Sequence, residues 1–162
     1  MNKSLLNEMT CTFTAVSENE SFARTIAASF ISQASPTVSQ LADVKCAVSE
    51  AVTKAVAPKI LIIFTLIHPL IHAHCAEVKM TISRFDDNSV IITISDKGIG
   101  IPDVEAARAP LYTTDTTGER SGMGFAIMEG LMDACRVRSK VGFGTVVTMK
   151  IRLGAVVCKS ST

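Results

Sequence analysis

The sequence predicts a two-layer α+β sandwich, in which a mixed β-sheet carries helices on one face. Three features lead to this expectation: alternating apolar residues near both ends, two consecutive helical stretches after the first strand, and two glycine-rich turns that flank a polar loop. With 162 residues and no internal repeat or low-complexity linker, the chain has the length of one domain with its own core. We therefore expect a single domain over residues 1–162.

The N-terminal part predicts one strand and two helices. Apolar and polar residues alternate over 9–16, which is typical of a half-buried strand. Helical spacing follows over 21–32, with Ser17 or Asn19 as the candidate N-cap. A second helix opens after Pro36, and its apolar stripe has i, i+3, i+4, i+7 spacing. The stripe comprises Val44, Ala47, Val48, Ala51, Val52 and Ala55. The other face carries Lys45, Ser49, Glu50 and Lys54.

The second half predicts four more strands and one helix. Asp87-Asn88 is a turn between the first two of these strands, and 142–144 is a glycine turn between the last two. Residues 103–120 are polar and are expected to be irregular, and the helix is expected over 123–134. The strands are expected at 78–82, 90–95, 137–141 and 146–153.

The first glycine motif, Asp96-Lys97-Gly98-Ile99-Gly100, directly follows a predicted strand. A carboxylate at Asp96 can accept a hydrogen bond from an exocyclic amine such as that of adenine. Glycine at positions 98 and 100 lets the backbone bend and approach a ligand where a Cβ would clash. Alone, the motif fits an ordinary strand-to-loop turn equally well.

The second glycine motif, Arg120-Ser121-Gly122-Met123-Gly124, opens the predicted helix. Exposed N–H groups and the helix dipole make such an end an anion site, and the Arg120 guanidinium can reach a terminal phosphate. The segment 109–118 between the two motifs is rich in hydroxyls and fits a lid that closes over a ligand. The pair of motifs therefore predicts a nucleotide pocket.

Charge and cysteine content exclude several classes of protein. The net charge of +1 gives no basic or acidic field for nucleic acid or an anionic membrane. Five scattered cysteines without a Cys-x-x-Cys pair fit a reducing cytosol better than a disulfide framework. The N-terminus lacks the apolar core of a signal peptide. We expect a cytoplasmic protein.

Taken together, the motifs resemble those of the GHKL, or Bergerat-fold, ATPase superfamily, and within it the anti-sigma serine kinases of spore-forming bacteria. The similarity covers residues 9–56 and 78–153. It rests on Asn19 to Arg24, Val48 to Thr53, Asp96 to Ile101, Glu105 to Arg108, Pro110-Leu111 with Thr113-Thr114, and Glu119 to Phe125.

The resemblance implies an ATP site and assigns roles to its residues. Adenine would bind at Asp96, Arg120 would meet the γ-phosphate, and Glu50 would be the general base that activates a serine of a partner. Thr113 and Thr114 would belong to the lid. The implied nucleotide-binding residues are Asp96, Gly98, Gly100, Thr113, Thr114, Ser121, Gly122, Gly124 and Thr145.

The resemblance also implies partners. The family forms a homodimer that sequesters sigma factor F and phosphorylates an anti-anti-sigma factor on serine, which controls transcription during sporulation. Arg24 resembles the residue that the family uses at its partner surface. Direct nucleic-acid or membrane binding is not expected.

The resemblance breaks at Lys54, where the family has the asparagine that holds Mg²⁺. A charged lysine has three donors and no acceptor, so it cannot coordinate a cation. Lys54 could instead pair with Glu50 four residues earlier, or its ammonium could meet phosphate directly. No residue is therefore predicted as a metal ligand, and Mg²⁺ is in doubt.

The apolar segment at about 56–77 also departs from the family. It has no formal charge over 60–76 and contains three histidines beside Cys75. The alternatives for its origin are a local reading-frame change and a divergent insertion. The alternatives for its structure are an extra buried strand, a poorly folded loop with exposed apolar residues, a metal site and a membrane span.

Two other functions remain as alternatives. The first is a nucleotide-binding sigma-factor trap of the same fold that transfers no phosphate, because Lys54 replaces the magnesium-binding asparagine. The second is the catalytic domain of a sensor histidine kinase, although no phosphoacceptor histidine helix precedes the motifs. A DNA-dependent ATPase of this fold would need a much longer chain.

Overall fold

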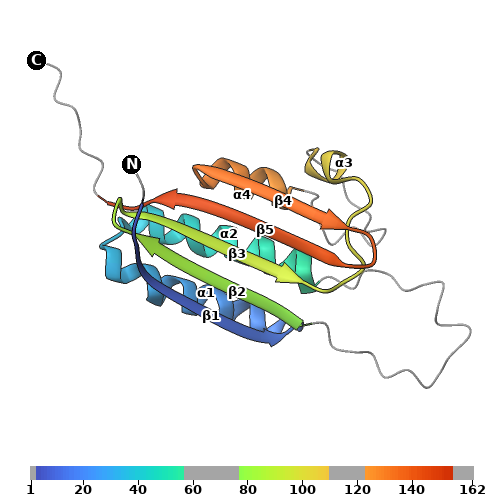
Figure 1. The fold of residues 1–162 in the computed structure, drawn as a ribbon, viewed down its shortest axis with the longest axis horizontal. Coiled ribbons are helices and arrows are strands. Elements are labelled where there is room, and N and C mark those ends of the chain that lie inside the picture. Colours follow the sequence, from blue (N-terminus) through green and yellow to red (C-terminus); the bar gives the residue numbers. More distant parts are fainter. Residues whose placement is uncertain (1–2, 57–76, 110–122, 155–162) are drawn as a thin grey trace, which may run out of the picture.

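The computed structural model describes residues 3–56, 77–109 and 123–154. These residues form one five-stranded sheet with the order β1-β2-β3-β5-β4. The strands are β1 (Leu5–Thr14), β2 (Glu77–Phe85), β3 (Ser89–Asp96), β4 (Ala134–Lys140) and β5 (Gly144–Arg152). The helices lie on one face of this sheet (Figure 1). The predicted two-layer α+β class is confirmed.

The sheet is antiparallel in every described pairing, not mixed as the sequence predicted. The chain passes through two helices between β1 and β2, and these return it to the end of the sheet where β1 finished (Figure 1). Two further pairs, β2 with β3 and β4 with β5, are hairpins. The connection from β3 to β4 is a crossover, and these two strands run in the same direction, each antiparallel to β5, which lies between them.

The main helices are α1 (Glu18–Ile31), α2 (Val38–Val56) and α4 (Gly124–Leu131), and a short 3₁₀ turn, η1 (Ser32–Ala34), follows α1. Ser17 stands at the N-cap of α1 but makes no side-chain capping bond there, and Asn19 donates instead to the Thr14 carbonyl at 2.8 Å. At the start of α2, Thr37 and Gln40 cap each other reciprocally, with bonds of 3.0 and 3.2 Å.

A short helix, α3 (Val104–Arg108), lies within the stretch 103–120 that the sequence analysis described as irregular. That expectation is wrong for these residues. Asp103 is their N-cap, and its carboxylate accepts the N–H of Ala106 at 2.9 Å. A single turn of helix is too short to show an apolar period, which is why the polar composition hid it. The rest of the predicted lid, from residue 110, lies outside the described residues.

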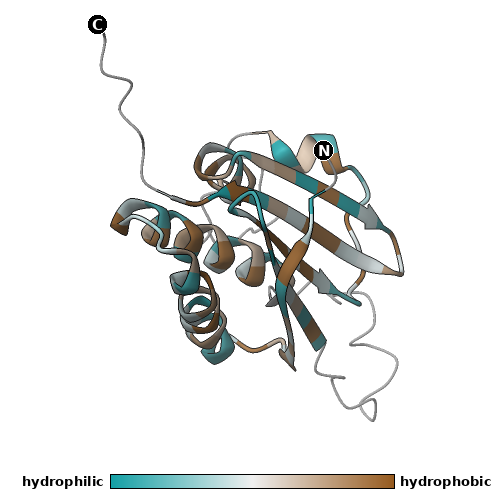
Figure 2. Ribbon diagram, turned by 60° about the vertical axis from the view of Figure 1, so that its left-hand side comes forward, coloured by the Kyte–Doolittle hydropathy of each residue, from teal (hydrophilic) through white to brown (hydrophobic). Residues whose placement is uncertain are grey.

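The core lies between the helices and the covered face of the sheet, and Figure 2 shows the two layers edge-on. The predicted apolar stripe of α2 is confirmed as its buried face. Its residues Val44, Ala47, Val48, Ala51 and Val52 have at most 1% of their surface exposed. Each buried valine contributes about 1.5–3 kcal/mol relative to an exposed one. This burial fixes the rotation of α2 about its axis.

The apolar segment predicted at about 56–77 lies almost wholly outside the described residues. Val56 is the last residue of α2 and Glu77 is the first residue of β2. Among the helices that the structure describes, none combines the length and the apolar character needed to cross a membrane.

Glycine is required where the turn after β3 meets the β4–β5 hairpin. Gly100 has φ +76°, and a Cβ there would lie 2.2 Å from the carbonyl oxygen of Lys140. Gly144 has φ +101°, and its Cβ would lie 2.0 Å from the carbonyl oxygen of Asp96. The Gly142 N–H donates to the Ile99 carbonyl at 2.8 Å. The two loops therefore touch backbone to backbone, which a side chain at 100 or 144 would prevent.

A charged cluster joins the N-terminus to the β2–β3 turn and the end of β5. The Asp87 carboxylate pairs with the Lys3 ammonium and lies 3.4 Å from the Arg152 guanidinium. The bond from Lys3, followed by that from Ser89, holds the pKa of Asp87 well below its usual range. This carboxyl group therefore favours folding in its charged form.

We expect Gly100→Ala to destabilise the protein much more than Gly142→Ala. Gly142 has a similar φ of +81°, but no atom lies within 4 Å of its Cβ position. Gly142→Ala therefore measures only the cost of placing a non-glycine residue at positive φ, about 1–2 kcal/mol. Collision with the Lys140 carbonyl should cost Gly100→Ala a further 1–3 kcal/mol or so. Urea unfolding of both variants measures the difference, and equal losses would contradict the close approach of the two loops.

We expect Asp87→Asn to lower the melting temperature at neutral pH and to lose this effect in acid. Because the folded pKa is depressed, the contribution of Asp87 is complete above the unfolded pKa of about 3.9. It disappears as the pH falls through the lower folded pKa. Thermal unfolding between about pH 2.5 and 7 tests this. Asp86→Asn, at the exposed neighbouring position, is the control. A deficit that persists unchanged into acid would argue against the charge pairing.

Candidate functional site

Asp96 and Thr145 form one end of the candidate site, where β3 and β5 pair. They are register partners, and 8% and 6% of their surfaces are exposed. Both continue the series of inward-facing residues of their strands, so their side chains lie on the helix-covered face of the sheet. The Asp96 Oδ1 accepts the Gly98 N–H at 2.7 Å, which orients the carboxylate. Sequence analysis predicted both positions, and the structure brings them together.

Ser139 completes this polar end, and sequence analysis did not identify it. Its hydroxyl lies 2.9 Å from the Thr145 hydroxyl, accepts the Ile101 N–H at 2.7 Å and donates to the Gly144 carbonyl at 3.0 Å. It therefore links β4, β5 and the turn after β3. The signal was available: Ser139 pairs with Thr145 across the hairpin that the glycine turn at 142–144 predicted.

Glu50 and Lys54 form a second group, one turn apart on α2, where this helix packs beside α4. A methyl group on Gly124 would lie 2.6 Å from the Glu50 Oε2 and 2.8 Å from the Lys54 Cε. Both side chains therefore reach the first residue of α4. The Lys54 Nζ also lies 4.1 Å from the centre of the Phe125 ring, a cation–π contact. Phe125 ends the motif Glu119 to Phe125, but the sequence analysis did not predict that its ring would contact the Lys54 ammonium.

The first turn of α4 supplies backbone donors at the same place. Among the described residues, the Ile127 N–H donates to the Met123 carbonyl at 2.9 Å near the start of this helix. The first N–H groups of an α-helix point out of its N-terminus. That end carries the partial positive charge of the helix dipole, which favours an anion.

Five predicted site residues lie in the stretch 110–122, which is outside the described residues: Thr113, Thr114, Arg120, Ser121 and Gly122. Their placement stays a prediction. The candidate metal ligands around Cys75, with the three histidines, fall in 57–76 and are equally untested. Among the residues that are described, no cluster of three or more His, Cys, Asp or Glu side chains could hold a metal ion.

Arg24 lies in a groove between α1 and α2, next to Glu50. Its guanidinium donates to the Ser49 hydroxyl at 3.2 Å and lies 3.5 Å from the Glu20 carboxylate. Ser49 in turn donates to Glu20. About 39% of the Arg24 side chain remains exposed. The open groove has a volume of about 460 Å³ and is lined by Ser21, Arg24, Thr25, Lys45, Cys46, Ser49 and Glu50.

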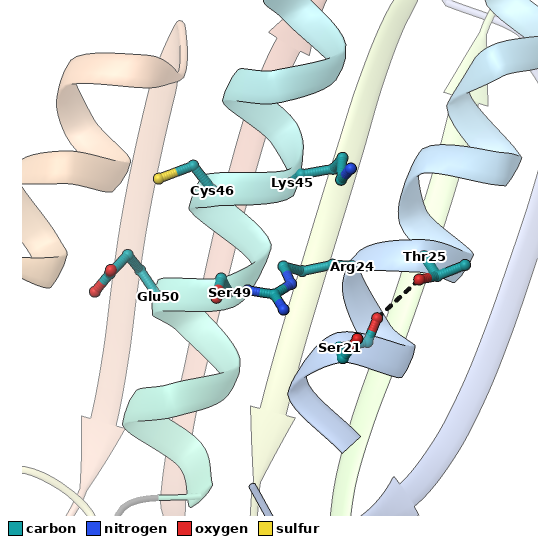
Figure 3. A pocket seen from close by; sticks show the side chains of 7 residues that line it. All are labelled: Ser21, Arg24, Thr25, Lys45, Cys46, Ser49 and Glu50. Carbon is teal, nitrogen blue, oxygen red and sulfur yellow. Dashed lines mark hydrogen bonds between the residues drawn. The ribbon is translucent and has the colours of Figure 1, made fainter. Parts of the chain in front are cut away.

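Figure 3 shows how Glu50 relates to this groove. Arg24 reaches from α1 toward Ser49, whereas Glu50, on the same turn of α2, points away toward α4. One helix therefore presents a carboxylate that borders both the groove and Gly124. A side chain from a second protein that enters the groove can come close to Glu50, and an anion at the start of α4 can approach it from the other side.

Outside this site and the charged cluster around Asp87, the pKa shifts concern two half-buried thiols and one surface ion pair. Burial raises the pKa of the Cys11 and Cys135 thiols, so neither has the character of a reactive thiolate. Hydrogen bonding to Glu129 raises the pKa of Arg108, which stays charged and joins α3 to α4 at 2.7 Å.

Comparison with known proteins agrees with the geometry. The family model of the histidine kinase-, DNA gyrase B- and HSP90-like ATPases matches residues 43–155. Anti-sigma F factor of Pasteuria penetrans is 47% identical over 154 residues, which cover 92% of this chain and 93% of that protein. Anti-sigma F factor of Bacillus licheniformis is 45% identical over 141 residues, covering 87% and 89%, respectively.

Solved structures share the fold at low sequence identity. The crystal structure of the RsbU and RsbW domains of Rv1364c from Mycobacterium tuberculosis matches with a TM-score of 0.61 and 18% identity, over 91% of this chain and 33% of that one. The catalytic domain of the histidine kinase ThkA matches with a TM-score of 0.51 and 15% identity, over 90% and 96%. The chain therefore belongs to the anti-sigma F factors, within the histidine kinase-, DNA gyrase B- and HSP90-like ATPase family.

Proposed function

We propose that this chain is an anti-sigma factor and an ATP-dependent protein serine kinase. It sequesters sigma factor F and phosphorylates an anti-anti-sigma factor on serine, and so controls transcription during sporulation. The observation that carries the kinase assignment is the position of Glu50, whose carboxylate reaches Gly124 at the start of α4 and also borders the Arg24 groove. We also propose that it works in the cytoplasm as a homodimer.

The adenine of ATP would bind at the polar end of the site. The Asp96 carboxylate accepts a hydrogen bond from the exocyclic amine, and Thr145 with Ser139 supplies hydroxyls beside the base. The turn through Gly98 and Gly100 shapes the adjoining wall. Their position supports this role, because both polar side chains lie at paired strand ends on the helix-covered face of the sheet.

The phosphates would lie toward the N-terminus of α4. Gly122 and Gly124 would leave room for them, Arg120 would contact the γ-phosphate, and Ser121 would donate a hydrogen bond. Thr113 and Thr114 would close over the nucleotide as part of the lid. The position of Lys54 supports this path, because its side chain brings an ammonium to the first residue of α4.

Phosphoryl transfer would then proceed by positioning and charge stabilisation. The partner's serine enters between Arg24 and Glu50, and Glu50 takes the hydroxyl proton as the serine oxygen bonds to the γ-phosphorus. The bond from that phosphorus to the bridging oxygen breaks, and ADP leaves. Arg24 would orient the partner, because an exposed arginine held by neighbouring side chains is a typical anchor at an interface.

Mg²⁺ is the usual cation of phosphoryl transfer, and the residues at its expected position do not fit it. The Lys54 side chain at Gly124 offers an ammonium, which has no lone pair to give. No step above therefore passes through Mg²⁺. The same observation favours one alternative function, a sigma-factor trap that binds nucleotide without transferring phosphate, in which Lys54 draws Glu50 away from its substrate.

We expect Glu50→Gln to lower phosphotransfer to the anti-anti-sigma factor by at least about 100-fold, because the general base is lost. The affinity for ATP should stay within about threefold of that of the unmodified protein, since the proposed contact of Glu50 is with the partner's serine and not with the adenine. Labelled ATP, purified partner and a nucleotide titration measure both quantities. Glu77→Gln, at the exposed start of β2, is the matched control. If the unmodified chain binds ATP and sigma factor but transfers no label, the trap replaces the kinase.

We expect Arg24→Met to weaken binding of sigma factor F by about tenfold or more, with ATP affinity unchanged. Ser49→Ala keeps the Arg24 charge but removes its 3.2 Å partner, so it should weaken binding less. Calorimetry with purified sigma factor measures both variants. Equal affinities for Arg24→Met and the unmodified protein would exclude the groove as the partner surface.

A further inference from the structure

We propose that the Lys54 ammonium is the cation that neutralises the nucleotide phosphates in this chain, so that the protein binds ATP without Mg²⁺. This inference rests on the nucleotide site of the proposed function. It deepens that proposal, because it names the form of ATP that the site takes: the free tetra-anion in place of the magnesium complex.

The position of the ammonium carries the inference. The Lys54 Nζ lies 3.5 Å from the point that a Cβ of Gly124 would occupy, which is at the first residue of α4. The first N–H groups of an α-helix point out of that end, and the Lys54 side chain lies beside the first residue of α4. A lysine charge and a helix N-terminus that converge on one place favour the same kind of ligand, an anion.

Phe125 holds the ammonium in this position. Its ring lies 4.1 Å from the Lys54 Nζ, and only 2% of its surface is exposed. A buried ring cannot follow a mobile side chain, so the cation–π contact limits where Lys54 can go. Lys54 leaves the end of α2 directly after the stripe whose burial fixes that helix. The charge is therefore preorganised before any nucleotide binds.

The same charge opposes a divalent cation. Ligands of Mg²⁺ are oxygens that donate lone pairs, and an ammonium has none to offer. Two cations a few ångströms apart also repel each other, more strongly in a site shielded from water. Glu50 is the nearby carboxylate on this face of α2, and it already has Lys54 one turn away. Lysine at 54 therefore replaces the metal rather than assisting it.

The test is calorimetric titration of the full chain with ATP, once in EDTA and once in excess MgCl₂. We expect affinity in EDTA to equal or exceed that in MgCl₂, because magnesium masks the charge that Lys54 recognises. Lys54→Met keeps the stem over Phe125 but removes the charge, and should weaken binding in EDTA by about tenfold or more. Lys54→Arg keeps the charge and should retain ATP binding in EDTA. Lys79→Met, exposed on β2, is the control for loss of a lysine elsewhere.

Lys54→Asn is the reciprocal variant, since it replaces the ammonium with an oxygen donor. We expect this variant to bind ATP in MgCl₂, and its affinity for ATP to be about tenfold or more weaker in EDTA. This is the reverse of the unmodified protein. Thermal unfolding without nucleotide shows whether each variant is folded. The comparison of the two buffers needs no variant, so it stands even if one variant fails to fold.

The outcomes separate this inference from the proposed function. ATP binding that requires Mg²⁺ in the unmodified chain, or unchanged affinity of a folded Lys54→Met in EDTA, would overturn the inference and leave the nucleotide site intact. Absence of ATP binding in both buffers would overturn the inference together with the nucleotide part of the proposed function. Tight binding in EDTA that depends on the charge at 54 would support it.

Discussion

Burial of one face of α2 is the constraint on which the rest of the site depends. Five of its apolar residues have at most 1% of their surface exposed, and together they fix the helix against the sheet. A helix turns by about 100° per residue, so a fixed buried face also fixes where every polar residue points. Ser49 then faces α1, and Glu50 and Lys54 face α4. The chemistry at Gly124 is thus a consequence of core packing.

Backbone contact between two loops fixes the other end of the site. At Gly100 and Gly144 the carbonyls of Lys140 and Asp96 occupy the space that a side chain would need. Sequence analysis assigned Gly100 to a close approach of the ligand, whereas here the close approach is to the neighbouring hairpin. This contact still matters for the candidate site, because it holds the strand ends that carry Asp96 and Thr145 in register. Asp96 is therefore held opposite Thr145, and its carboxylate accepts the Gly98 N–H.

Lys54 brings a positive charge to the start of α4. In an ATPase of this family, the cation is expected to arrive with the nucleotide. Here a positive charge belongs to the chain itself and rests on a buried aromatic ring. A resident charge costs desolvation in the empty protein, and the ring partly offsets this cost. Glu50 borders the groove and also reaches Gly124, so a charge beside Glu50 affects both places.

The sequence by itself determined the order of the strands and main helices and the buried face of α2, because periodicity and glycine turns are local signals. The sequence did not predict the short helix α3, because a single capped turn has no apolar period to detect. Only the tertiary structure decided that every strand pair is antiparallel, that Ser139 joins Thr145, and that Lys54 lies on Phe125. The strand directions and the contact of Lys54 with Phe125 involve segments far apart in the chain, and they depend on how the two layers pack, which no local pattern encodes. Ser139 and Thr145 are only six residues apart, but their contact depends on the register of the β4–β5 hairpin.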